Sequence, residues 1–463
     1  MVALCLRVRM ELKIKPLHGS QELEVKVTFR IPRAGAGNPE MSFEQIEEAL
    51  AQQLNAIGSG TTEHLLGQYD APGSALQCGQ GKKWTSKGPS KRLIETPYGA
   101  VSVLAHVYQT SAGGRVRIPL AERARLISSA TPRMAKMTAA KLAEMSCAAV
   151  ARDLECNHQR PISKSYAQDL GQAVAALVTA HEGQLDDWQP KSTVAEVVTI
   201  AIGVDGAHLN TRQPGWRQSM AGTLALYDRD GQRLETLYAG AGPGDTPPKG
   251  KASFFKRMDS LIKKLRQSYP QAHVVGLSDG ASDLQNYLAD CCDEHLLDYH
   301  HAAEYLSKAS AAFSVEGGGE NSESARAWAR EQRETLRDKP AGALEVLATL
   351  RRRLGLAAAQ PGEIKLPAMS QAQQEAVQSA ETYFVNHIGN MDYAGWQKRK
   401  LPIGSGVTEA ACKTLIKQRM CQSGMRWSIE ASDALISLRA LYLTPSRWNH
   451  FWQTHGSIPV FPL

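Results

Sequence analysis

One segment near the middle of the chain limits the possible folds more than any other. Residues 197–204 form an almost unbroken apolar, β-branched run that ends at Asp205. A run without polar alternation is typical of a strand that is buried on both faces. Such a strand needs layers on both sides, so an α/β core is expected.

The segments that follow supply the rest of this core. Strand patterns cover 222–227 and 233–239, and a basic helix is expected over 251–267. A second buried strand, 273–277, leads into Ser278–Asp279–Gly280, and a short strand is expected at 296–299. This order of elements predicts a mixed sheet flanked by helices.

Smaller elements are expected at the start of the chain. Apolar residues at every second position over 2–14 and 23–31 predict a β-hairpin. Residues 42–56 predict a helix with one apolar face. Residues 72–92 are rich in Gly, Pro, Lys and Arg and are expected to form a basic loop before a β segment at 100–108.

The later part of the chain has a helical pattern. Residues 302–394 are helical and charge-rich, with breaks expected at Gly317–Gly319 and at Pro361–Gly362. The final segment opens with Gly404–Ser405–Gly406 and continues in helices to Leu443.

Length and composition exclude several protein classes. A chain of 463 residues suggests about three domains. The eight Cys contain no C-x-x-C pair, so neither a disulfide scaffold nor a zinc ribbon is supported. No stretch reaches the roughly 18 apolar residues of a membrane span, and Arg7 and Arg9 interrupt any signal peptide. A cytoplasmic protein that does not associate with a membrane is expected. Its formal charge of +7 permits nucleic acid as a partner.

Three carboxylates are the candidate chemical groups. Asp205 and Asp279 each follow a predicted buried strand and precede a Gly, where catalytic groups of open α/β sheets gather. Glu409 lies in the first turn of a later helix, for which Ser405 and Thr408 are candidate N-caps. If the three converge, they would hold two Mg²⁺ (or Mn²⁺) ions, which activate a water or a 3′-hydroxyl.

An ordinary structural explanation exists for each carboxylate taken alone. A strand-end Asp–Gly pair is common turn chemistry. Glu409 is also a favourable acid at a helix N-terminus.

Four blocks in this order change that balance: IAIGVDGAHL, VVGLSDGASD, LDYHHAAEYL and LPIGSGVTEAACKTLIKQRM. Together they resemble the catalytic domain of bacterial DDE transposases, in the ISKra-type branch of the Mutator-like group. The resemblance covers about 195–450. It implies a ribonuclease-H-like fold, a catalytic and metal-binding triad of Asp205, Asp279 and Glu409, and an α-helical insertion between the second and third acids.

The expected fold is therefore α/β, a ribonuclease-H-like mixed sheet with an α-helical insertion, preceded by a smaller α+β and helical DNA-binding region. The expected domains are an N-terminal α+β region at 1–125, a helix-turn-helix-like region at 126–192, a catalytic domain at 193–301 and 395–450, and the insertion at 302–394.

Asp298–Tyr299–His300–His301 gives the D-x-x-H pattern that Mutator-like relatives place after the second Asp. His301 would then lie near the scissile phosphate or position a base. The alternative is a helix start, with Asp298 as N-cap and His301 packed in the first turn.

A basic stretch follows Glu409. Its members, expected to contact DNA phosphates, are Lys413, Lys417, Arg419 and Arg426. Because Lys413 is four residues past Glu409, an ion pair on a solvated helix is the alternative.

Residues 130–177 have a helical pattern, with breaks expected at 156–158 and at Pro161. They could form a helix-turn-helix, in which Lys164 and Tyr166 lie early in the third helix, where base contacts are usual. Plain helical packing is the alternative.

The function that the resemblance implies is cleavage and joining of transposon-end DNA. The partners would be the element ends and the target DNA, and a homodimer or higher oligomer would handle two ends together, in the cytoplasm of a bacterium at its nucleoid. Two alternatives stay open: a transposase-derived DNA-binding protein without catalysis, and a ribonuclease-H-like nuclease without strand transfer.

Overall fold

The computed structural model describes residues 10–16, 23–29, 42–73, 75–77, 83–180, 188–212, 215–244, 250–315, 319–358 and 366–454. The chain divides into two compact units. One comprises Met1–Glu182 with Asn449–Leu463, and the other comprises Gly183–Trp448.

The first unit begins with the predicted hairpin. Strands β1 (Met10–Pro16) and β2 (Leu23–Phe29) pair antiparallel. The flanking positions 2–9, 17–22 and 30–31 lie outside the described residues.

Helix α1 (Phe43–Gly67) starts where the sequence predicts and continues past the expected end at residue 56. Ser42 accepts a hydrogen bond from the Gln45 backbone, and the Gln45 side chain accepts one from Ser42 N, which forms a capping box. The helix packs on strand β5 of a four-stranded antiparallel sheet. Its strands are β3 (Ala75–Gln77), β4 (Lys83–Glu95), β5 (Ala100–Thr110) and β6 (Gly113–Arg117).

The loop predicted over 72–92 is wrong for its second half, because residues 83–92 belong to β4. This strand pairs with β5 along its whole length, and a register shift between Ser86 and Pro89 accommodates the Gly–Pro step. Pairing with an apolar neighbour outweighs the weak local strand propensity.

Four helices complete this unit: α2 (Pro119–Arg123), α3 (Pro132–Glu144), α4 (Cys147–His158) and α5 (Lys164–Ala180). The predicted break at 156–158 is wrong, because α4 continues to His158. It ends at Gln159, whose φ of 53° is left-handed. The break at Pro161 is confirmed.

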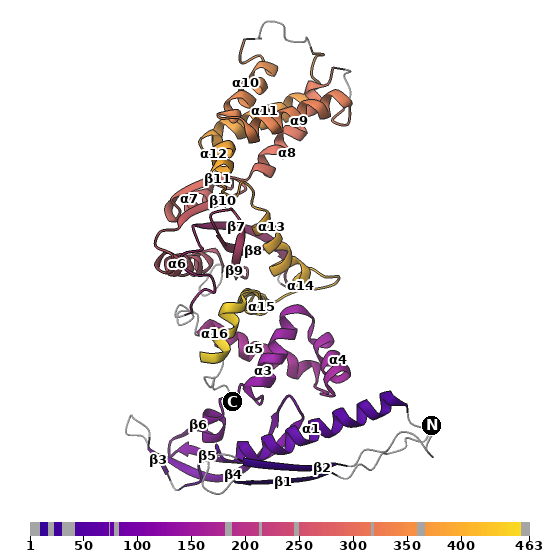
Figure 1. The fold of residues 1–463 in the computed structure, drawn as a ribbon, viewed down its shortest axis with the longest axis vertical. Helices are drawn as coiled ribbons and strands as arrows, with labels where there is room; N and C mark the ends of the chain where they lie inside the picture. The colour runs from indigo at the N-terminus through magenta and orange to yellow at the C-terminus, as the bar shows by residue number, and fades with distance from the viewer. Residues whose placement is uncertain are drawn as a thin grey trace. The chain divides into compact units, whose positions relative to one another are not determined.

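The second unit contains the predicted mixed sheet, with strand order β11-β10-β7-β8-β9 (Figure 1). Strands β7 (Thr199–Asn210), β8 (Trp216–Tyr227) and β9 (Arg233–Ala241) form an antiparallel meander. Strands β10 (His273–Ser278) and β11 (Glu294–Leu297) run parallel to β7. The predicted order of strands and helices is confirmed.

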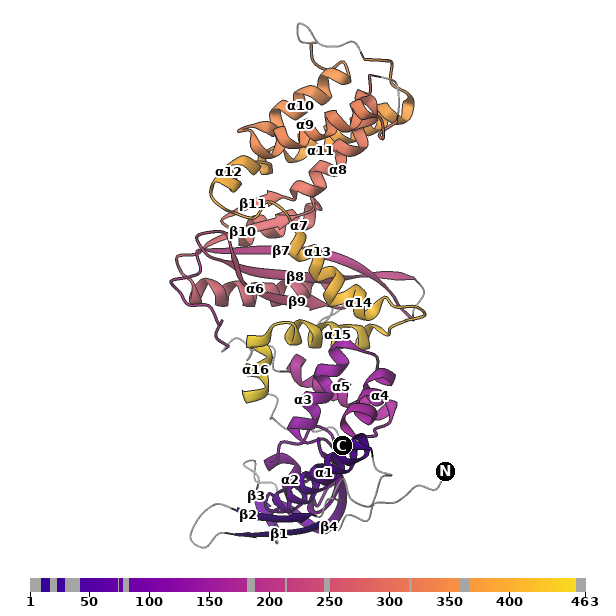
Figure 2. The ribbon, with the colours of Figure 1, turned by 45° about the vertical axis from the view of Figure 1, so that its right-hand side comes forward.

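Helices cover both faces of this sheet (Figure 2). On one face, α6 (Gly250–Ser268) and α7 (Ser282–Cys291) pack on Ile200, Ile202 and Val204. On the other lie α13 (Gly406–Ala411), one turn of π-helix (Cys412–Lys417), α14 (Gln418–Met420) and α15 (Ile429–Tyr442). The chain continues into α16 (Pro445–Thr454).

The expected insertion is helical. It consists of α8 (Tyr299–Ala309), a 3₁₀ turn at Ser310–Phe313, α9 (Glu323–Asp338), α10 (Gly342–Arg353), α11 (Gln371–His387), a 3₁₀ turn at Ile388–Asn390 and α12 (Tyr393–Lys398). It shares a core with Ala201, Val275 and Leu277 of the sheet. The short strand predicted at 296–299 ends earlier, because Asp298 caps α8. Residues 317–318 of the first predicted break and the whole second break, Pro361–Gly362, lie outside the described residues.

Among the described residues, no helix combines the length and the apolar character that crossing a bilayer requires.

Candidate functional site

Asp205 on β7 and Asp279, one residue past the end of the parallel strand β10, occupy equivalent positions in the register. The register pairs Gly203 of β7 with Leu277 of β10, and each Asp comes two residues after its paired residue. Side chains alternate along a strand. Asp205 therefore lies on the same sheet face as Gly203, and Asp279 on the same face as Leu277. Parallel strands lie about 4.8 Å apart, so the two carboxylates start from adjacent backbone positions.

The prediction that Asp205 follows the end of its strand is wrong. Strand β7 continues to Asn210, because β8 pairs with it from Asp205 opposite Ala221 to Asn210 opposite Trp216. Only the parallel neighbour ends here, at Ser278. Asp205 therefore lies within β7, where the strand is still paired with β8 on one side but no longer paired with β10 on the other. Asp279 follows its strand as predicted.

Glu409 lies on α13, which packs on the Asp205 face of the sheet. The hydroxyls of Thr408 and Thr223 are 2.8 Å apart and anchor this helix to β8. Gly203 permits the approach, since a Cβ there would lie 1.8 Å from Thr408 Oγ1. The side chain of Glu409, next to this anchor, is exposed.

The surroundings of Cys412 connect Asp205 with Glu409, because both carboxylates affect the pKa of this thiol. This buried thiol packs with Ala207 and Leu209 on the same sheet face. Burial raises its pKa, and the carboxylates of Asp205 and Glu409 raise it further. The raised pKa keeps this thiol protonated at neutral pH.

Asp279 lies in a tight turn beside a lysine. Its Oδ1 accepts a hydrogen bond from Ala281 N at 3.1 Å, and Gly280 has a φ of +105° that favours glycine. Lys251, at the start of α6, forms an ion pair with Asp283. Burial lowers the pKa of Lys251 and the Asp279 carboxylate opposes that shift, which places a cation near the candidate site. The position of Lys251 near Asp279 was not predicted from the sequence, because no local pattern connects the two residues.

The three carboxylates suit a hard cation in type. Oxygen ligands from Asp and Glu are those that Mg²⁺ and Mn²⁺ prefer. In this structure, Asp205 Oδ1 accepts a hydrogen bond from Gly206 N at 2.6 Å. Within the described ranges, no three His, Cys, Asp or Glu side chains are gathered closely enough to hold an ion. The structure thus places the three carboxylates around one region of the sheet without bringing them into a ligand cluster.

The D-x-x-H segment starts a helix. Asp298 Oδ1 accepts hydrogen bonds from His300 N at 2.5 Å and from His301 N at 3.0 Å, so it caps α8. The capping alternative is confirmed. His301 is partly buried in the first turn of α8.

Of the two predicted caps of the Glu409 helix, Ser405 is confirmed in position and Thr408 is wrong. Ser405 is at the N-cap position of α13 but makes no side-chain capping bond, since its hydroxyl donates to Asp298. Thr408 lies inside the helix and bonds to Thr223. Both hydroxyls therefore form hydrogen bonds with residues distant in sequence and do not cap the helix.

The basic residues after Glu409 separate into two kinds. Lys413, Lys417 and Arg426 are exposed, and the ion pairs found among the described residues do not include Lys413 with Glu409. Arg419 differs from the expectation, because it is only 3% exposed and its guanidinium lies 5.5 Å from the centre of the Trp427 ring. The exposed cations can meet a phosphate, whereas Arg419 packs inside its unit.

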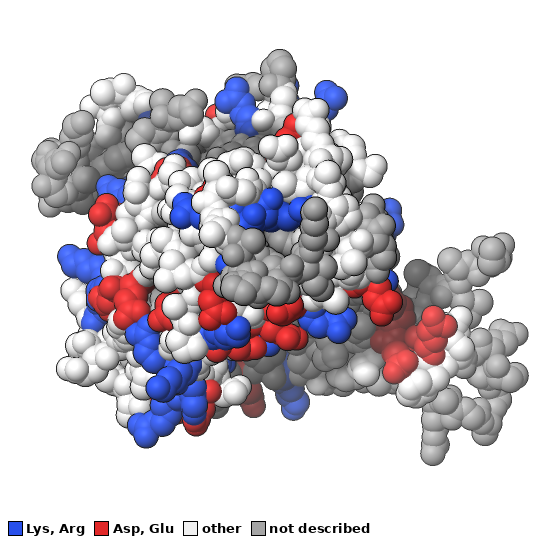
Figure 3. All heavy atoms as spheres, turned by 90° about the horizontal axis from the view of Figure 1, so that it is seen from above, with Lys and Arg blue, Asp and Glu red and all other residues white. Residues whose placement is uncertain are grey.

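Much of the remaining surface charge is locally neutralised. Figure 3 shows Lys and Arg side chains among Asp and Glu side chains on the face that it presents. Ion pairs of the second unit include Lys339–Glu345, Arg351–Glu381 and Arg399–Glu294.

The two candidate base-contacting residues differ in exposure. Ser163 Oγ accepts from Tyr166 N at 3.0 Å at the start of α5, and Lys164 is exposed there. Tyr166 is partly buried, its hydroxyl accepts from Ser129 Oγ at 3.3 Å, and burial raises its pKa to about 12. The predicted base contacts stay a prediction, with Lys164 the more accessible residue.

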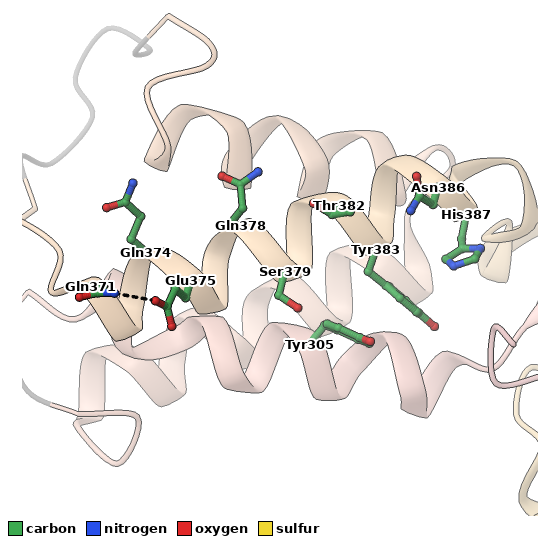
Figure 4. Close-up of a pocket in the computed structure, with 10 residues that line it drawn as sticks. All are labelled: Tyr305, Gln371, Gln374, Glu375, Gln378, Ser379, Thr382, Tyr383, Asn386 and His387. Atoms are coloured by element: carbon green, nitrogen blue, oxygen red, sulfur yellow. Dashed lines mark hydrogen bonds between the residues drawn. The ribbon is translucent and has the colours of Figure 1, made fainter.

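A polar groove of about 740 Å³ runs along α11 and α8. Figure 4 shows Tyr305 of α8 beside Tyr383 of α11, with amide and hydroxyl side chains along α11. The two rings stack with centroids 4.0 Å apart, and a Cβ on Gly280 would lie 3.5 Å from Tyr383. Burial raises the pKa of Tyr383, and the charges of Asp298 and Asp279 add to this, so its phenol stays neutral. Tyr383, which lines the groove, thus also packs against the turn that follows Asp279.

Comparison with models of known protein families and with curated proteins finds no match for this chain.

Proposed function

We propose that this chain is a DNA transposase, a metal-dependent enzyme that cleaves and joins transposon-end DNA. The observation that carries the proposal is the common register of Asp205 on β7 and Asp279 just past the parallel strand β10, with the Glu409 helix packed on the same face. In this proposal, three acids from three separate segments would face one region of the sheet.

The strand order supports a ribonuclease-H-like catalytic domain at 193–301 and 395–450. Numbered along the second unit, the sheet order is 3-2-1-4-5, with the first three strands antiparallel and the last two parallel to the first. The helices at 302–394 interrupt this domain between the second and third acids, as the resemblance implies.

Asp205, Asp279 and Glu409 would hold Mg²⁺ or Mn²⁺, two ions in the proposed arrangement. Bound ions of this kind lower the pKa of water and stabilise the leaving oxygen of a phosphodiester. Exposed Lys413 and Lys417 would contact DNA phosphates beside the acids.

The proposed reaction has two steps. In the first, a water oxygen bonds to phosphorus, and the 3′-oxygen leaves with the bonding electrons and takes a proton. In the second, the freed 3′-hydroxyl loses its proton and its oxygen bonds to a phosphorus of the target DNA, and the target 3′-oxygen leaves with the bonding electrons and takes a proton. Since two ends must be joined together, we propose that the chain acts as a homodimer or higher oligomer, at the bacterial nucleoid.

The test uses the full-length protein and labelled duplexes that carry the DNA flanking its reading frame, with Mg²⁺. Joined products from the wild type, and none from Asp279→Asn, are expected. Asp290→Asn is the matched control, since this exposed residue on α7 lies outside the candidate site. Cleavage without joining would indicate a nuclease, and binding without cleavage a transposase-derived DNA-binding protein. Full activity of Asp279→Asn would refute the assignment.

A further inference from the structure

We infer that Asp298 is a positioning residue that fixes the place of Glu409 through Ser405. The role of Glu409 as a metal ligand rests on the proposed function, whereas the contacts of Asp298 do not. Asp298 is only 1% exposed and directly follows Leu297, which pairs with Ser278 in the parallel register. It is therefore the next acid in the row formed by the ends of β10 and β11.

The two oxygens of Asp298 face different segments. Oδ1 caps α8 through His300 N and His301 N. Oδ2 accepts from Ser405 N at 2.5 Å and also from Ser405 Oγ. One buried carboxylate thus joins the end of β11 to a residue 107 positions later in the chain.

The link continues from Ser405 to Glu409. The carbonyl oxygen of Ser405 accepts from Thr408 N at 2.7 Å and from Glu409 N at 2.9 Å. Nearby, Tyr299 N donates to Ile403 O at 3.0 Å, so the segment before α13 is held along the start of α8. Glu409 lies in the first turn of the helix that begins at Gly406, so the position of this turn sets the position of Glu409.

Capping alone does not explain this arrangement. Asp392 caps α12 with one bond to Gly395 N at 3.0 Å, and it is exposed. Asp298 has the same type of cap and adds two bonds from Ser405. The segments also approach closely, since a Cβ on Gly404 would lie 3.0 Å from His300 Cδ2.

Replacement by Asn separates the two roles. An Asn side chain is a good N-cap and can keep its oxygen on His300 N and His301 N. Its amide nitrogen then faces Ser405 N, which is also a donor, so that bond is lost. Asp298→Asn therefore keeps the α8 cap and releases the segment before Glu409.

The experiment compares full-length wild type, Asp298→Asn and the control Asp392→Asn by hydrogen–deuterium exchange and by Mn²⁺ titration. In Asp298→Asn, we expect backbone amides of 405–409 to exchange at least tenfold faster and Mn²⁺ to bind at least tenfold more weakly. In the cleavage assay, a high Mg²⁺ concentration should restore most of the rate, which it cannot do for Asp279→Asn. Asp392→Asn should change none of these.

Unchanged exchange of 405–409 in a folded Asp298→Asn variant would overturn the inference. Faster exchange with unchanged Mn²⁺ affinity would also overturn it, because Glu409 would not depend on the link. If the wild type binds no Mn²⁺ and cleaves no DNA, the proposed function fails, while the exchange data still decide whether Asp298 fixes this segment. Ser405→Ala provides a second variant that removes one of the two Ser405 bonds and should show a smaller effect in the same direction.

Discussion

Replacing Gly203 with Ala tests how tightly the Glu409 helix packs on the sheet. The new Cβ would lie 1.8 Å from Thr408 Oγ1 and 3.1 Å from Thr223 Oγ1. Both hydroxyls are buried and bonded to each other at 2.8 Å, so neither can move aside without losing its partner. The substitution should push α13 away from the sheet.

The expected cost has two parts. Overpacking a well-packed core costs about 1–3 kcal/mol. The lost hydrogen bond between two buried hydroxyls adds about 0.5–1.5 kcal/mol. A total of about 1.5–4.5 kcal/mol should lower the Tm by roughly 3–18 °C, at about 2–4 °C per kcal/mol for a unit of this size.

Thermal unfolding followed by circular dichroism measures this cost. Gly206→Ala, in the same strand, is the matched control, because its Cβ would meet only the end of the flexible Gln218 side chain, at 2.2 Å from Nε2. In a Thr408→Ala background, Gly203→Ala should cost less than in the wild type, since the contact at Oγ1 is gone. A Tm of Gly203→Ala within about 1 °C of the wild type would refute the packing argument.

Two further predictions concern charge. Lys413→Gln with Lys417→Gln should flatten the slope of log affinity for DNA against log salt by about two, and an unchanged slope in the folded protein would exclude phosphate contacts. In the first unit, burial alone would raise the pKa of Asp70, but its bonds with His106 outweigh this and hold the pKa below 3.8. The pair therefore stabilises the fold above about pH 4 and loses its effect as pH falls through the depressed pKa, so Asp70→Asn should cost about 1–3 kcal/mol at pH 7 and less at about pH 3. Melting curves at both pH values measure the difference, and an equal cost at both would contradict it.

The sheet of the second unit was predictable from the sequence, because buried strands show themselves as apolar runs. The run at 197–204 indicated β7, and the positions of Asp205 and Asp279 after paired apolar segments indicated a shared edge. The end of β7 was not predictable. Its extension to Asn210 depends on pairing with β8, and no local pattern carries that information.

The site was predictable only in part, for a related reason. Types and order of acids are visible in a sequence, whereas contacts between distant segments are not. Asp298 looked like a helix cap, and its bonds to Ser405 depend on how β11 and α13 meet. Arg419 looked like its basic neighbours, but the fold buries it against Trp427.

The π-helical turn at Cys412–Lys417 has a consequence for how this helix can change. It lies within a continuous helical stretch from Gly406 to Met420 and holds more residues than an α-helical turn would. Each residue advances an α-helix by about 100°, so removing one residue here would rotate Glu409 by about that angle relative to everything after Lys417. The direction in which this acid points is thus set by a count of residues, and a one-residue deletion should harm the site more than most substitutions within the turn.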